Sequence, residues 1–211
     1  QGKTFSAEQL VEMLSSENIW WRKLGQRLFN DSKDPNAVAL LQQFLDTTSS
    51  AEGTVHALWL MDEAGYSKPD QLIRALKHPV AGVRENAVRI AENYLGKWPE
   101  LEKSLLAMAD DPSAKVRYQL LCSLGDVSGM QSSIVRRKIL LRDIEDDWVQ
   151  IAALTSSRSP VEEIISLRTS SEAMERYTEK ASAIVALSQQ KENIERILYY
   201  ALDDNAAATP K

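Results

Sequence analysis

Residues that carry chemistry are scarce in this chain. Its 211 residues include one cysteine and two histidines, so an internal disulfide is impossible and the four Cys/His ligands typical of structural zinc are not available. Glycine (8) and proline (7) are also few, whereas an all-β sandwich of this length needs many more turn residues. These shortages favour a helical protein with neither metal nor cofactor.

The chain also lacks an excess of positive charge and a long apolar run. Its formal net charge is −5 and its pI is about 5.2, whereas a nucleic-acid binder usually presents a basic patch that neutralises phosphates. No stretch of about 18 apolar residues occurs, which is the length that a membrane-spanning helix needs. We therefore expect no nucleic-acid partner and no membrane span in this part of the protein.

What is present is an internal repeat of an apolar residue followed by a polar one. The polar members are 34, 28, 33 and 33 residues apart in the pairs Trp21-Arg22, Val55-His56, Val83-Arg84, Val116-Arg117 and Val149-Gln150. We call the first members the anchors and expect all five to be buried equivalents. An apolar pair stands ten and eleven residues before each of the first four anchors: Leu10-Val11, Phe44-Leu45, Leu72-Ile73 and Leu105-Leu106. Before the fifth anchor only Ile139 fits this pattern. A small or apolar residue stands four residues after every anchor: Gly25, Trp59, Ala87, Leu120 and Ala153.

This spacing predicts an all-α chain of helix–turn–helix units, because four residues make about one turn of a helix face. The predicted repeats lie near 6–30, 35–64, 68–94, 98–125 and 130–157. Their first helices are expected near 6–15, 35–45, 68–77, 98–109 and 130–144, and their second helices near 19–30, 52–64, 79–94, 112–125 and 146–157. Terminal helices are expected over 160–202. We predict a single domain over residues 1–202, with a concave face lined by the second helices.

Helix-start signals support these bounds. Ser6 and Gln9 form a predicted capping box. Pro79 and Pro112 are expected at the first position of a helix, where a missing N–H costs nothing, and Asp111 is expected to cap the helix after it. Residues 203–211 are predicted to be a linker. Together with Gln1, which no charged and apolar leader pattern follows, this tail leads us to expect an internal piece of a longer protein.

Two turn-plus-anchor segments resemble the HEAT repeat: Asp111-Pro112-Ser113-Ala114-Lys115-Val116-Arg117 and His78-Pro79-Val80-Ala81-Gly82-Val83-Arg84. The resemblance implies a right-handed α-α superhelix, a HEAT/armadillo-like solenoid of five to six hairpins. HEAT repeats pair a turn aspartate with a helix arginine as a ladder between neighbours. Asp111 and Arg117 keep that spacing here, but His78 replaces the aspartate in the other turn, so no continuous ladder is expected.

A more specific likeness covers most of the chain. The segments 20–28 (Trp-Trp-Arg-Lys-Leu-Gly-Gln-Arg-Leu), 56–59 (His-Ala-Leu-Trp), 111–120 and 147–150 (Asp-Trp-Val-Gln) resemble, in this order, the HEAT-repeat portion of large bacterial (planctomycete-type) membrane-bound dehydrogenase proteins. In that family a dehydrogenase-like β-propeller precedes the repeats and a c-type cytochrome (haem-binding) domain follows. The resemblance implies a periplasmic or extracytoplasmic location. The haem-attachment motif Cys-x-x-Cys-His is absent here, so no haem chemistry is carried over.

No constellation of residues predicts an active site. Cys122 lies in an apolar helical context, where burial makes a thiol inert, and we expect it to be a small buried hydrophobe. The pairs Asp110-Asp111 and Asp146-Asp147 are typical of helix caps. The basic tract at 136–138, with Arg142, is typical of a solvated helix face. We therefore predict a non-enzymatic scaffold that binds other domains of the same chain or another protein.

The candidate interface consists of tryptophan and arginine positions: Trp20, Arg22, Arg84, Arg117 and Trp148. Trp21 is expected in the core, whereas Trp20 is either an N-terminal packing lock or a docking point, and Trp148 has the same two interpretations. Trp59 and Trp98 are read as core and inter-repeat packing. The alternative function is a HEAT-like DNA glycosylase, in which Arg22, Arg84 and Arg117 would line a basic face; the acidic composition weighs against it.

Overall fold

The computed structural model describes residues 5–32, 35–127, 129–156, 160–166 and 171–202, and every regular element within them is a helix. Helices occur where the repeat predicts them, and most ends agree within a few residues. Three helices continue into a tighter 3₁₀ turn, as helix ends often do: Ala81–Ala91, Pro99–Leu106 and Ala114–Ser123. The all-α class and the hairpin repeat are thus confirmed.

The chain divides into two compact units, residues 1–120 and 121–211, and the boundary falls inside α8. The first unit holds four helical hairpins, built from α1 Ala7–Met13, α2 Ile19–Ser32, α3 Pro35–Thr47, α4 Ala51–Glu63, α5 Pro69–Ala75, α6 Ala81–Ala91, η1 Glu92–Tyr94, α7 Pro99–Leu106, η2 Ala107–Asp110 and the start of α8 Ala114–Ser123.

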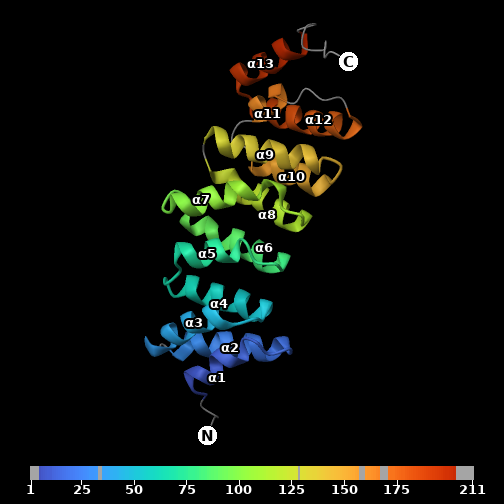
Figure 1. Cartoon of the computed structure of the whole chain (residues 1–211). Coiled ribbons are helices and arrows are strands. Elements are labelled where there is room, and N and C mark those ends of the chain that lie inside the picture. Colours follow the sequence, from blue (N-terminus) through green and yellow to red (C-terminus); the bar gives the residue numbers. More distant parts are fainter. Residues whose placement is uncertain (1–4, 33–34, 128, 157–159, 167–170, 203–211) are drawn as a thin grey trace. The chain divides into compact units, whose positions relative to one another are not determined.

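Hairpins in the first unit stack as α-α solenoid repeats (Figure 1). First helices pack on their own second helices, as α1 does on α2, α3 on α4 and α5 on α6. Like helices of neighbouring repeats also pack on each other, as α2 does on α4 and α4 on α6. The core between the two layers is aliphatic, with Leu14, Leu41, Leu60, Leu101 and Leu105 fully buried. Burial of these side chains is the main favourable term that holds the repeats together.

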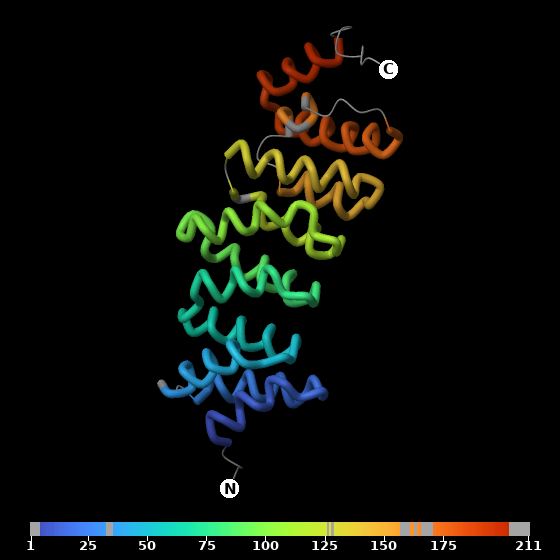
Figure 2. The backbone as a smooth tube through the Cα atoms, in the orientation of Figure 1, coloured from blue at the N-terminus to red at the C-terminus, as the bar shows by residue number. Residues whose placement is uncertain are grey.

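The second unit holds η3 Leu124–Asp126, α9 Met130–Arg142, α10 Asp147–Ser156, α11 Pro160–Ser166, α12 Glu172–Leu187 and α13 Lys191–Leu202. Here α9 packs on α10, and α11 packs on both α12 and α13 (Figure 2). The predicted terminal helices within 160–202 are therefore present. The prediction of one domain over 1–202 stays a prediction, and the predicted linker at 203–211 lies outside the described residues.

Helix starts follow the sequence signals in part. The capping box is confirmed: the Gln9 N–H donates to Ser6 Oγ at 3.3 Å and the Ser6 N–H donates to Gln9 Oε1 at 3.0 Å. The placement of Pro79 and Pro112 at a first helical position was wrong, because α6 begins at Ala81 and α8 at Ala114. Both prolines instead belong to the preceding turn, where a fixed φ suits a turn residue.

Anchor burial holds in three of the five repeats. Val83, Val116 and Val149 are 1%, 0% and 4% exposed, and Val55 is half-buried. The prediction that Trp21 is buried was wrong, because this side chain is 40% exposed. The reason lies one turn further along α2, at Gly25.

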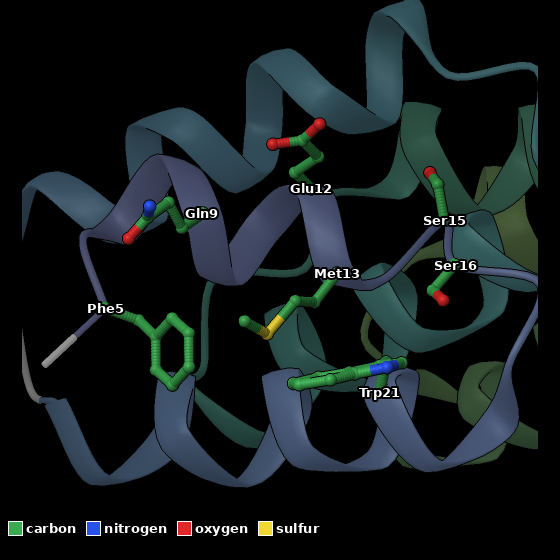
Figure 3. A pocket seen from close by; sticks show the side chains of 7 residues that line it. All are labelled: Phe5, Gln9, Glu12, Met13, Ser15, Ser16 and Trp21. Carbon is green, nitrogen blue, oxygen red and sulfur yellow. The ribbon is translucent and has the colours of Figure 1, made fainter. Parts of the chain in front are cut away.

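Gly25 brings α1 and α2 too close together for a large anchor to enter the seam between them. A Cβ at this position would lie 2.8 Å from Met13 Cβ and 3.0 Å from the carbonyl oxygen of Leu10. Close packing of this kind leaves little free volume. The Trp21 indole therefore lies at the edge of the seam, against Met13, rather than inside it (Figure 3).

Alanine substitution of two helical glycines should have effects of opposite sign. Gly25→Ala should lower the free energy of unfolding by about 1–2 kcal/mol, because the destabilisation from overpacking exceeds the stabilisation from higher helix propensity. Gly82→Ala, where an added Cβ meets nothing within 4 Å, should raise it by about 0.5 kcal/mol. Urea denaturation of both variants measures this, and a destabilised Gly82→Ala or a stabilised Gly25→Ala would contradict the close approach of α1 and α2.

Candidate functional site

A hollow of about 480 Å³ opens on the first hairpin, between α1 and the start of α2 (Figure 3). We call it the α1–α2 hollow; it is lined by Phe5, Gln9, Glu12, Met13, Ser15, Ser16 and Trp21. Phe5 and Met13 also pack on the buried core of the first repeats, so their side chains are held from behind. The volume lies within the range of small ligand sites in proteins.

Beside the hollow, three consecutive apolar side chains at the start of α2 are exposed. Ile19, Trp20 and Trp21 are 55%, 60% and 40% exposed. The two indoles make an edge-to-face pair, with ring centroids 4.9 Å apart and planes at 83°, which is a favoured geometry for aromatic rings. Asn18, just before α2, accepts the Trp20 N–H at 2.9 Å and so fixes the helix start that carries them. Both interpretations of Trp20, packing lock and docking point, stay predictions.

A second feature recurs in both units: the polar residue after an anchor donates back to the turn. Arg84 Nη1 donates to the His78 carbonyl at 2.7 Å, and Arg117 Nη1 donates to the Asp111 carbonyl at 2.6 Å. Gln150 Nε2 donates to the Ile144 carbonyl at 2.8 Å, and Arg22 Nη1 to the Ser16 carbonyl at 2.6 Å. Each acceptor lies six residues before its donor. These bonds satisfy backbone carbonyls of the turns.

One arginine–aspartate rung connects neighbouring repeats. Arg84 Nε donates to Asp111 Oδ2 at 2.7 Å and its Nη2 to Oδ1 at 2.9 Å, with side chains only 11% and 6% exposed. Arg84, one repeat before Asp111, thus makes the bidentate pair that the sequence spacing suggested for Arg117. Asp111 Oδ1 also accepts the N–H of Ser113 at 2.9 Å. Ser113 directly precedes α8, so Asp111 bonds to the turn before the helix and not to its first residues.

The electrostatics of the rung agree with its geometry. Burial acts to raise the pKa of Asp111, but hydrogen bonds from Arg84 and from the Ser113 N–H outweigh burial and hold the pKa below its ordinary value. The hydrogen bond with Asp111 raises the pKa of Arg84. Both groups therefore stay charged and paired in the folded protein.

The hydrogen bonds of the arginines to the turns remove most of these side chains from the predicted interface. Arg84 and Arg117 are 9% and 5% exposed, so they offer little surface to a partner and do not form an exposed basic row. Arg22 is half-buried. Trp148 is 68% exposed, on α10 of the second unit. Exposed tryptophans, rather than arginines, are the part of the candidate set that a partner can reach.

Removal of the Asp111 carboxylate should be strongly destabilising. Asp111→Ala leaves the guanidinium of Arg84 buried without its counter-charge, and we expect a loss of about 3–5 kcal/mol in the free energy of unfolding. The matched control is Asp70→Ala, which removes an exposed carboxylate 2.9 Å from Arg74 Nη1 and should cost less than about 1 kcal/mol. Denaturant unfolding compares the two, and equal losses would contradict a structural role for the rung.

His56 replaces the arginine in its repeat but makes a different contact. Its Nδ1 lies 2.9 Å from Gln26 Oε1 on the preceding second helix, which suits a neutral ring that donates from Nδ1. Burial, followed by the charges of Arg22 and Lys23, lowers the pKa of His56 below its ordinary value of 6.5. Folding therefore favours the neutral imidazole.

This shift makes stability depend on pH. Because the folded pKa lies below 6.5, the unfolded chain binds more protons in the interval between the two values, and the free energy of unfolding should fall as the pH is lowered through that interval. His56→Gln should remove this part of the pH dependence, whereas His78→Gln should retain it. Thermal or urea unfolding from pH 7.5 to 5 measures both, and an unchanged slope in His56→Gln would contradict the shift.

The repeat pattern in the sequence does not predict several polar contacts made by the second helices. Trp59 Nε1 donates to Asn86 Oδ1 at 2.9 Å, joining α4 to α6. Tyr94 donates to Asp62 at 2.6 Å, and its ring stacks on Trp98 with centroids 3.9 Å apart. Trp59 and Trp98 are half-buried and not part of the buried core, and the Trp59–Asn86 bond joins neighbouring repeats. A repeat period places such residues on one face but does not pair them.

Two predictions of exposure or burial need correction. Cys122 is half-buried rather than buried, because its position on α8 lies beside the buried face rather than on it. Arg136 was expected on a solvated face with Arg137, Lys138 and Arg142, but it is 7% exposed. Its Nη2 donates to the Ala153 carbonyl at 3.1 Å and to Ser156 Oγ at 3.2 Å, so it links α9 to α10.

Within the described parts of the chain, no group of three or more His, Cys, Asp or Glu side chains is placed to hold a metal ion. Across the same residues, no helix has the length and apolar character to cross a membrane.

Comparison with known proteins gives structural neighbours only. No protein-family model matches the chain, and no curated protein matches it. Among solved structures, a designed armadillo repeat protein in complex with the peptide (KR)4 aligns with 16% identity and a TM-score of 0.46, covering 97% of this chain and 100% of that one. A second designed armadillo repeat protein aligns with 15% identity and a TM-score of 0.45, covering 96% and 100%. An engineered protein aligns with 16% identity and a TM-score of 0.43, covering 95% and 98%.

Proposed function

We propose that this chain is a non-catalytic helical-repeat scaffold that binds protein domains through exposed apolar side chains. The observation that carries the proposal is the trio Ile19, Trp20 and Trp21, each at least 40% exposed at the start of α2. Adjacent exposed aromatic residues are costly to leave in water and are enriched at the energetic centres of protein interfaces.

The second unit supports the same function with its own apolar surface. On α13, Leu198, Tyr199 and Leu202 are 54%, 77% and 78% exposed, and none of the twelve residues of this helix is buried. Leu187, at the end of α12, is 81% exposed. An amphipathic helix with apolar side chains this exposed has an apolar face that another protein surface can cover.

We further propose that the bound domains belong to the same parent protein, in which this chain spaces a propeller-type dehydrogenase domain from a c-type cytochrome domain outside the cytoplasm. This part of the proposal rests on the sequence resemblance of segments 20–28, 56–59, 111–120 and 147–150. Apolar surface in the first hairpin and in the last helices is what a spacer between two domains requires. The glycosylase alternative needs an exposed basic row, and the burial of Arg84 and Arg117 gives it no support.

Substitution of Trp20 should weaken domain binding selectively. We expect the chain to bind the separately produced propeller or cytochrome domain in isothermal titration calorimetry, and Trp20→Ser to weaken that binding at least about tenfold, as loss of an aromatic hot spot does. Tyr66→Ser is the matched control, because Tyr66 is also an exposed aromatic of the first unit, at 55%, and it should change affinity less than about twofold.

Three results would count against the proposed function. Absence of binding to either domain would remove the spacer role, and equal effects of Trp20→Ser and Tyr66→Ser would remove Trp20 from the interface. Salt-sensitive binding of short duplex DNA by the wild-type chain would instead favour the glycosylase alternative.

A further inference from the structure

The α1–α2 hollow combines an apolar wall with one carboxylate. Met13 and Phe5 come from α1 and the segment before it, and Trp21 comes from α2; in Figure 3 the Met13 side chain and the Phe5 ring gather beside the flat Trp21 ring. The backing of Phe5 and Met13 by core residues and the edge-to-face contact of Trp20 on Trp21 hold this wall in place before any ligand arrives. Such preorganisation lowers the cost of binding.

The charge at the hollow is negative. Of its seven lining residues, Glu12 is the charged one; it is exposed, and no lysine or arginine of the described residues forms an ion pair with it. Glu8 and Glu17 are exposed nearby in sequence. Arg22, the residue after Trp21, donates from Nη1 to the carbonyls of Ser16 and Glu17 at 2.6 and 2.9 Å.

Two of the uncharged polar side chains of the wall bond to the backbone of the same hairpin. Gln9 Oε1 accepts the Ser6 N–H at 3.0 Å, and Ser16 Oγ accepts the Asn18 N–H at 3.3 Å. Glu12 is the lining side chain that carries a negative charge. A ligand that suits the hollow has an apolar stem and a positive end.

We propose that the α1–α2 hollow binds a lysine or arginine side chain of the partner protein. The methylene stem packs on Phe5 and Met13, and the charged head lies over the Trp21 ring. Glu12 projects from the other side of α1 in Figure 3, so it favours the cation through its nearby negative charge and not through a direct ion pair. Trp is the side chain with the strongest attraction for a cation over its face, and long basic side chains bury their stems on apolar surface while keeping the charge in contact with polar groups. The inference rests on the proposed function in one respect, that the ligand is a side chain of a protein.

The binding can be tested with isolated side-chain analogues. The probes are N-acetyl-arginine methylamide and N-acetyl-lysine methylamide, compared with N-acetyl-norleucine methylamide, which keeps the apolar stem without the charge. Titration into ¹⁵N-labelled protein should shift the indole N–H signals of Trp21 and Trp20, with affinities in the millimolar range. We expect the norleucine probe to bind at least about threefold more weakly, because it lacks the cation–π term.

Variants separate charge from shape. Trp21→Leu should abolish the preference for the cationic probes over norleucine. Glu12→Gln should weaken binding of the cationic probes about two- to fivefold, as expected for the loss of an exposed charge near the site. Glu100→Gln, which removes an exposed glutamate from α7, is the matched control and should leave affinity unchanged. Unchanged backbone amide spectra show that each variant is folded.

Equal binding of norleucine and arginine probes, equal effects of Glu12→Gln and Glu100→Gln, or no shift of either indole signal would overturn the inference. Such a result leaves the scaffold proposal standing if the chain still binds its neighbouring domains in a Trp20-dependent way. Probe binding without any domain binding would do the reverse, supporting the cation site and removing the proposed spacer role.

Discussion

The turns inside the helical hairpins are closed by side chains that reach back from the second helix to a carbonyl six residues earlier. This contact ties the start of the second helix to the turn and gives a turn carbonyl a hydrogen-bond donor. Arg84 and Arg117 make it with a guanidinium, and Gln150 makes it with an amide while fully buried. The Gln150 Oε1 atom also accepts a hydrogen bond from Lys180 Nζ at 3.0 Å, which links α10 to α12.

A guanidinium in this position brings a positive charge into the seam between repeats, and the charge needs compensation. Asp111 supplies it to Arg84 with two hydrogen bonds from the next repeat. The local turn and the stacking of repeats are therefore coupled: the residue that orders one turn also selects the aspartate of its neighbour. Because Arg84 and Arg117 bond to the turns, both are buried. Among the candidate interface residues, the exposed tryptophans are therefore the side chains best placed for recognition.

Sequence reasoning succeeded where the physical signal is periodic. A recurrence of about 33 residues predicted the helices, and it identified Val83, Val116 and Val149 as core positions, since four-residue spacing marks one face of a helix. It failed where the answer depends on the adjacent repeat. The Asp111 carboxylate pairs with Arg84 of the preceding repeat, while Arg117 bonds to the Asp111 backbone carbonyl, and Arg136 is buried against α10. The contacts of Arg84 and Arg136 are made across helices whose distance and rotation no spacing in the chain encodes.

The first hairpin shows how one departure from the repeat creates a candidate site. In three later repeats the anchor is a valine small enough to enter the seam, but here the anchor is a tryptophan and the residue one turn later is Gly25, which draws α2 onto α1. A close helix–helix contact and a buried indole cannot both fit in that space. The indole is displaced to the rim, where Met13 and Phe5 meet it and Glu12 faces solvent. A position that elsewhere stabilises the core becomes surface available for binding, and the cost of exposing an aromatic ring is offset only when a ligand covers it.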